Sequence, residues 1–178
     1  MKNYVECDII IISFNELGGV VMKKFLIIVM VILLIIIAAL VSLGGLVKER
    51  DALTAGEFTS IMESKDFIIV DAGSQFANYD YIESATLAIN ENYQIEFYVL
   101  SDENYAGRFF ANNKEKFESE KGTMSTSSSV NFANGAKYTL NTDGKFKVVT
   151  NIENTVIYLD VNESNKSEVE SLLKEINY

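Results

Sequence analysis

The sequence predicts a single N-terminal transmembrane helix followed by an α+β domain, in which about three helices pack an antiparallel sheet. Three observations lead to this class. One apolar run extends from Phe25 to Val47. Tight-turn signals separate the short apolar segments of residues 48–178, which makes neighbouring strands antiparallel. Segments with apolar residues at helical spacing come before, between and after those strands, as in α+β folds.

The apolar run has the length of a membrane span. Phe25 to Leu43 is a stretch of 19 residues without a charge, and Ser42 is its only polar residue. A helix rises ~1.5 Å per residue and so covers about 28 Å here, close to the ~30 Å hydrocarbon core of a bilayer. We therefore expect Phe25–Val47 to cross the lipid bilayer, within a signal anchor of residues 22–47.

The flanks favour an uncleaved anchor with a cytoplasmic N-terminus. Lys23-Lys24 resemble a basic n-region, and the nearest small-residue cleavage pattern, Ser42-Leu43-Gly44, is weak. Cleavage is the alternative interpretation. Lys48 and Arg50 nearly balance the two lysines, so the orientation depends on the first-helix default and on the few basic residues of the outer domain. The expected location is the cell membrane, with the C-terminal domain extracytoplasmic.

Residues 1–21 are expected to be an untranslated leader read in frame, or a short cytoplasmic tail. Met22-Lys23-Lys24 is a natural start for a bacterial exported protein, and Leu17–Val20 can be encoded by TTA-GGA-GGT-GTN, which contains a ribosome-binding sequence. The only cysteine, Cys7, lies in this segment. Residues 48–178 must then fold without disulfides, and a domain of that length can bury enough surface to do so.

The outer domain is expected to begin with a short helix, from about residue 55 to 64. Thr54 to Glu57 match the S/T-x-x-E capping box, and apolar residues follow at i, i+3 and i+4. A second helix begins at Ser101-Asp-Glu, where acid in the first turn suits the helix dipole, and ends near Gly122. A third helix closes the domain, because Ser167 to Glu170 repeat the capping box before an apolar stripe.

Apolar runs and turn residues place seven strands among these helices. The expected strands are Phe67–Val70 (buried), Ala85–Ile89, Gln94–Leu100, Val130–Phe132, Tyr138–Asn141, Lys145–Ile152 and Val156–Val161. Asp143-Gly144 is a type I′ hairpin signal, and Glu153-Asn154 supports another tight turn. Thr123–Ser129 is interpreted as a flexible loop. The order is helix, three strands, helix, four strands, helix, and we expect the helices to bury their stripes on one sheet face.

Composition excludes several kinds of catalytic site. The chain has no His, so imidazole bases, imidazole metal ligands and His-dependent triads are ruled out. Ser–Lys pairs, carboxylate pairs and hard-metal sites remain. Residues 48–178 hold 12 Lys+Arg against 22 Asp+Glu, which argues against a nucleic-acid partner. No P-loop, G-x-G-x-x-G or H-E-x-x-H pattern is present, so we expect no cofactor.

Carboxylates are the remaining route to catalysis or metal binding. Asp160-Val-Asn162 begins like an EF-hand loop, but the required sixth-position Gly is Asn165, so we expect no metal site. Strand alternation turns Glu96 away from its apolar neighbours and toward solvent. A pocket that gathered Asp71, Glu96 or Asp160 would instead favour a hydrolase. We therefore expect no catalytic residues in this chain.

Tyrosine is the residue type most suggestive of binding. Eight of the nine tyrosines lie in the outer domain, where such rings can stack on a sugar or form a protein interface. Tyr79, Asp80 and Tyr81 form the best surface candidate, because the sequence places them in a loop between strands.

The chain also resembles small membrane-anchored, lipoprotein-like cell-surface proteins of Gram-positive bacteria. The resemblance covers residues 22–178 and depends on the basic start, the apolar span and four segments: Leu53–Phe58, Gln94–Tyr98, Asn154–Tyr158 and Ile176–Tyr178. Where such proteins carry a lipidated Cys after the span, this chain has Leu43-Gly44-Gly45. The resemblance implies a location at the cell surface and supplies no activity.

Together these patterns predict a membrane-tethered extracytoplasmic module that binds an envelope protein or glycan without catalysis. Two alternatives remain open at this point: an envelope hydrolase that uses carboxylates or a Ser–Lys pair, and a structural subunit of a membrane complex.

Overall fold

The computed structural model describes residues 28–36 and 49–178, and the chain divides into two units, residues 1–47 and 48–178. In the first unit, the described residues 28–36 are helical and exposed. Among the described parts of the chain, no helix is both long and apolar enough to cross a membrane. The expected leader 1–21 and most of the expected span Phe25–Val47 lie outside the described residues.

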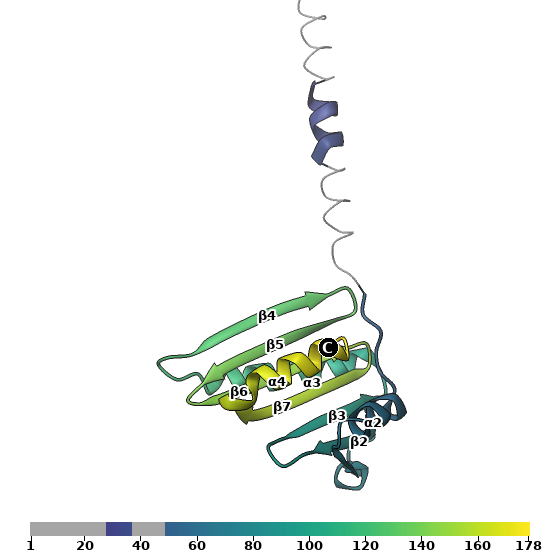
Figure 1. Cartoon of the computed structure of the whole chain (residues 1–178). Coiled ribbons are helices and arrows are strands. Elements are labelled where there is room, and N and C mark those ends of the chain that lie inside the picture. The colour runs from purple at the N-terminus through teal and green to yellow at the C-terminus, as the bar shows by residue number, and fades with distance from the viewer. Residues whose placement is uncertain (1–27, 37–48) are drawn as a thin grey trace, which may run out of the picture. The chain divides into compact units, whose positions relative to one another are not determined.

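The second unit is an α+β domain with a seven-stranded antiparallel sheet in residues 49–178, as the sequence predicts (Figure 1). Its elements, in chain order, are α2 (Ala55–Glu63), β1 (Ile68–Asp71), η1 (Gly73–Phe76), β2 (Ile82–Ile89), β3 (Gln94–Leu100), α3 (Glu103–Ser119), β4 (Thr126–Phe132), β5 (Gly135–Thr142), β6 (Lys145–Ile152), β7 (Thr155–Asn162), η2 (Glu163–Asn165) and α4 (Lys166–Glu175). The expected order of one helix, three strands, a helix, four strands and a helix is confirmed.

The sheet consists of two antiparallel meanders that join at their last strands. Its strand order is β1-β2-β3-β7-β6-β5-β4, so β3 and β7 lie at the junction and β1 and β4 form the edges. At the junction, Phe97 pairs with Ile157 and Tyr98 with Val156. Each of these two strands leads into a helix, α3 after β3 and α4 after η2.

The helices cover both faces of the sheet, so the expectation of one helical face is wrong. One apolar cluster contains Phe58 of α2, Leu173 of α4 and Phe97 of β3, while a second contains Ala106 of α3 and Tyr98 of β3. Because successive strand residues point to opposite faces, α2 and α4 lie on one side and α3 on the other. Figure 1 shows α4 in front of the sheet and α3 behind it. We call these sides the α4 face and the α3 face.

Several local predictions are confirmed by the hydrogen bonds and backbone angles. Thr54 and Glu57 form the complete capping box of α2, and the Asp102 carboxylate accepts from the backbone N–H of Tyr105 at the start of α3. Asp143 and Gly144 have φ values of 48° and 73°, the two positive angles that a type I′ turn requires. Local residue chemistry therefore determines these turns and helix starts.

Three local expectations are wrong. Thr126–Phe132 is a strand paired along its length with β5, although Thr123–Ser129 was expected to be a flexible loop. Both sides of this edge strand are exposed, so its polar residues give no apolar alternation. Ser167 does not cap α4, because η2 leads directly into a helix that begins at Lys166.

The third incorrect expectation concerns β1, which the apolar sequence predicts to be a buried strand. It pairs only with β2, and Ile68 is 69% exposed. Only Ile69 packs against the apolar cluster of the α4 face. An edge strand with one covered side has the same short apolar sequence as a buried strand, so the pattern does not distinguish them.

Candidate functional site

Four aromatic side chains from separate segments meet beside the α3 face. They are Phe76 at the end of η1, Tyr79 and Tyr81 in the connection to β2, and Tyr105 in the first turn of α3. We call this group the aromatic cluster. It contains both tyrosines of the predicted surface and adds two rings from elsewhere in the sequence.

The rings of the aromatic cluster contact one another in a fixed series. Tyr81 and Tyr105 stack in parallel, with centroids 5.0 Å apart and planes 7° apart. Tyr79 meets Tyr81 edge to face at 5.7 Å, and Phe76 lies 6.4 Å from Tyr79. Aromatic pairs in such geometries gain about 0.5–1.5 kcal/mol beyond the area they bury. The rings therefore hold each other in place at the surface.

Backbone hydrogen bonds position the segment that carries these rings. The N–H of Tyr79 donates to the carbonyl of Phe76 at 2.8 Å, and the N–H of Ile82 donates to the carbonyl of Tyr79 at 3.0 Å. The carbonyl of Tyr81 accepts from the N–H of Ser101 at 3.0 Å, which ties the connection to the end of β3. The cap at Asp102 then places Tyr105 next to Tyr81.

The aromatic cluster continues into the core. Phe76 meets Tyr98 edge to face at 5.5 Å, and Tyr98 lies 4.8 Å from Phe109 of α3. Tyr98 is buried, whereas Tyr79 is 49% exposed. The exposed ring thus belongs to a series anchored in the interior. Asp80, between Tyr79 and Tyr81, is exposed and adds a charge to this surface.

Glu96 is half-buried on the α3 face rather than fully turned to solvent. Strand alternation does place it opposite Phe97, as expected, but Tyr98 of the same strand covers part of it. The Tyr98 hydroxyl donates to the Glu96 carboxylate at 2.5 Å, and the Gln94 amide donates at 3.1 Å. Burial and the hydrogen bond to Glu96 raise the pKa of Tyr98.

Asp160 is also on the α3 face, in an ion-pair network. The Lys147 ammonium donates to Asp160 at 2.8 Å and to Glu120 after the end of α3. Burial lowers the pKa of Lys147, but the hydrogen bonds to Asp160 and Glu120 outweigh this and raise it. Burial and the nearby charges of Asp160 and Glu96 raise the pKa of Tyr158 to about 12.

The third carboxylate, Asp71, lies at the end of the edge strand β1. Its side chain accepts from the N–H of Gly73 at 2.8 Å and so starts the turn that leads to Phe76. Asp71 therefore helps to position the aromatic cluster, while Glu96 and Asp160 bind partners within the α3 face. Among the described residues, no group of three or more His, Cys, Asp or Glu is placed to hold a metal ion.

Sequence reasoning proposed Tyr79 and Tyr81 but not their neighbours. Tyr105 reads as part of the apolar face of a helix, and nothing local indicates that it stacks on a ring 24 positions earlier. No protein-family model, curated protein or solved structure matches this chain. The functional argument therefore depends on the geometry alone.

Proposed function

We propose that residues 49–178 are a non-catalytic binding module, held at the outer side of the cell membrane by Phe25–Val47, and that the aromatic cluster binds a partner protein of the cell envelope. The observation that carries this proposal is the series of interlocked rings with Tyr79 at its exposed end. Tyrosine is enriched at protein interfaces, where it contributes large contact area with few rotatable bonds.

The ring geometry favours a protein over a glycan as the partner. A sugar stacks on a free aromatic face, but Tyr81 and Tyr105 use one face of each ring for their parallel stack. The Arg108 guanidinium lies 5.8 Å from the Tyr105 centroid as well. The cluster mainly offers ring edges and hydroxyl groups, which suit the mixed apolar and polar surface of another protein.

The membrane anchor is supported by the length and apolar character of the run from Phe25 to Val47. The absence of a nearby Cys after the run favours a protein helix rather than a lipid as the anchor. The domain attached to this run is strongly acidic, which would limit its nonspecific binding to anionic membrane surfaces.

Site-specific photo-crosslinking in intact native cells tests the proposed partner surface. The full-length protein would carry p-benzoylphenylalanine in place of Tyr79, and a matched control would carry it in place of Met124, which is 90% exposed in the α3–β4 connection. We expect one discrete protein adduct at position 79 that is missing at position 124. Adding Tyr105→Ala should lower the adduct yield at least tenfold, because truncating a hot-spot residue costs about 2 kcal/mol or more of binding free energy.

Two results would contradict the proposal. One is an equal adduct pattern at both positions, which would show only exposure. The other is turnover of an envelope polymer by the purified full-length protein that is lost in Glu96→Gln or Asp160→Asn, which would favour the hydrolase alternative. The structural-subunit alternative would be favoured by a different result. In that case, position 79 would crosslink to a membrane complex of fixed stoichiometry, and the complex would not assemble without this protein.

A further inference from the structure

A cationic pocket lies on the other side of the domain from the α3 helix. It has a volume of about 250 Å³ and is lined by Arg50, Val130, Phe132, Lys137, Lys174, Asn177 and Tyr178. Three basic residues line it and no Asp or Glu side chain does. The domain that contains it has nearly twice as many acidic as basic residues, so this pocket reverses the charge of its surroundings.

The Arg50 side chain is held in place from two directions. Its guanidinium lies 3.5 Å from the ring centroid of Phe132, and its Nη1 donates to the carbonyl of Asn177 at 3.0 Å. The backbone of Arg50 is bound on both sides by the Asn134 amide, at 3.0 and 2.7 Å. Residues on β4, in the β4–β5 turn and after α4 thus position this guanidinium before any ligand binds.

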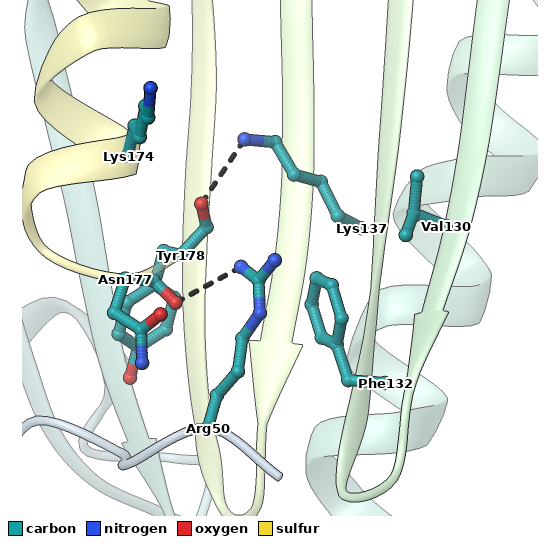
Figure 2. Close-up of a pocket in the computed structure, with 7 residues that line it drawn as sticks. All are labelled: Arg50, Val130, Phe132, Lys137, Lys174, Asn177 and Tyr178. Atoms are coloured by element: carbon teal, nitrogen blue, oxygen red, sulfur yellow. Dashed lines mark hydrogen bonds between the residues drawn. The ribbon is translucent and has the colours of Figure 1, made fainter. Parts of the chain in front are cut away.

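Lys137 approaches the same point from β5. Its ammonium donates to the carbonyl oxygen of Tyr178 at 3.2 Å, and Figure 2 shows it converging with the Arg50 guanidinium on the carbonyls of Tyr178 and Asn177. Burial and the nearby charge of Arg50 lower the pKa of Lys137, while the nearby charge of Glu170 acts in the opposite direction. The positive charges of Arg50 and Lys137 therefore repel each other within one pocket, and this repulsion is unfavourable in free energy.

Most of the donors in this site form no hydrogen bond to the described residues. A guanidinium has five N–H donors and an ammonium has three, and one hydrogen bond from each side chain is formed within the pocket. The ion pairs found among the described residues involve Lys65 and Lys147 but none of the three pocket cations.

We propose that this pocket binds a phosphate group, with the Arg50 guanidinium and the Lys137 ammonium as its donors. Guanidinium groups bind phosphate through two parallel N–H···O bonds, and an ammonium adds a point charge. Phe132 and the exposed Val130 contact the apolar part of the ligand next to the phosphate. Lys174 supplies a third charge at the rim.

This phosphate can belong to a phospholipid headgroup or to a soluble phosphate ester. Arg50 comes three residues after Val47, and an extended chain spans at most ~3.6 Å per residue, so in the proposed membrane-anchored protein the pocket would lie within reach of the headgroups. The assignment of the phosphate to a lipid headgroup therefore depends on the proposed membrane anchor, whereas the proposal of a phosphate site does not.

Titration of the full-length protein in neutral detergent micelles tests the site and separates the two sources. The probes are inorganic phosphate, short-chain phosphatidylglycerol and short-chain phosphatidylcholine, each followed by calorimetry. We expect saturable binding of phosphatidylglycerol or of inorganic phosphate, weakened at least tenfold by Arg50→Gln and by Lys137→Met. Binding of either lipid without binding of inorganic phosphate identifies a lipid headgroup, and binding of inorganic phosphate without binding of either lipid identifies a soluble ligand. Binding of both kinds of probe supports the phosphate site itself, with a headgroup as one ligand.

Lys166→Gln is the matched control. Lys166 also lies over an aromatic ring, with its ammonium 5.4 Å from the Phe146 centroid, but it is outside the pocket. The control should bind each probe like the original protein. If Arg50→Gln does not fold, the rim variant Lys174→Gln is used instead, with an expected loss of two- to fivefold. Equal losses in Lys166→Gln and the pocket variants, or no saturable binding of any probe, would overturn the proposal.

Discussion

The two faces of the sheet differ sharply in chemistry, although they are built from the same strands. On the α4 face, Phe58 and Phe97 stack in parallel at 4.5 Å within a cluster of aliphatic and aromatic side chains. The α3 face carries a connected group of polar side chains, which are Glu96, Tyr98, Lys147, Tyr158 and Asp160. Neighbouring residues in β3 or β6 point to opposite faces and therefore have different surroundings. Both faces bury apolar side chains, but the α3 face also holds an ion-pair network at the sheet and leads into the aromatic cluster, whereas the cations of the α4 side gather in the pocket beside β4.

Removing a ring from the α4 face should have the largest effect on stability. Phe97→Ala deletes a fully buried ring that stacks on Phe58, and such a change typically costs about 3–5 kcal/mol. Urea unfolding of the full-length protein in detergent would measure it. A cost below about 1 kcal/mol would mean that the α4 face is not the main source of stability.

Removing the central charge of the α3 face should lower the free energy of unfolding by less than removing the Phe97 ring. Lys147→Met deletes two hydrogen bonds to carboxylates that are each about one third exposed, so solvent partly compensates Asp160 and Glu120. We expect a loss of about 1–3 kcal/mol, the range for hydrogen bonds to charged groups. The same unfolding experiment checks this, and an equal cost for Lys147→Met and Phe97→Ala would remove the contrast between the faces.

The α3 face should also lose stability at alkaline pH. The pKa of Tyr158 is raised to about 12, above the ~10 of an unfolded tyrosine. The folded state then retains a proton that the unfolded state releases, so this stabilisation is complete below pH 10 and is lost as the pH rises to about 12.

The variant Tyr158→Phe isolates this contribution. Because part of the Tyr158 ring contacts solvent, we expect its unfolding free energy to rise relative to the original protein by on the order of 1 kcal/mol between pH 9 and pH 12. Absorbance at 295 nm would follow the ionisation directly. A difference between the two proteins that stays constant with pH would show that Tyr158 titrates normally.

The smallest expected change is a gain on the α4 face. Thr150 is fully buried in β6, and its hydroxyl has no hydrogen-bond partner among the described residues. Thr150→Val keeps the shape and removes this unsatisfied group, so the protein should become more stable by about 0.5–1 kcal/mol. Thermal unfolding compared with the exposed control Thr126→Val would detect it, and a decrease would indicate a partner for the hydroxyl.

The sequence by itself determined the order of the elements and much of their local chemistry. The capping box at Thr54, the cap at Asp102 and the turn at Asp143-Gly144 each depend on residues within four positions, so the pattern contains all the information needed. The same reasoning proposed Tyr79 and Tyr81 as a surface candidate, because they lie between two recognisable strands.

Only the tertiary structure decided which helix covers which face, which strands form the edges, and which distant side chains meet. Strand alternation separates Phe97 from Tyr98 but does not say what packs on either side. Arg50 and Lys137 are 87 positions apart in the sequence and come together because both contact the segment after α4, Arg50 at Asn177 and Lys137 at Tyr178. Such sites depend on contacts between segments far apart in the sequence, which no local pattern encodes.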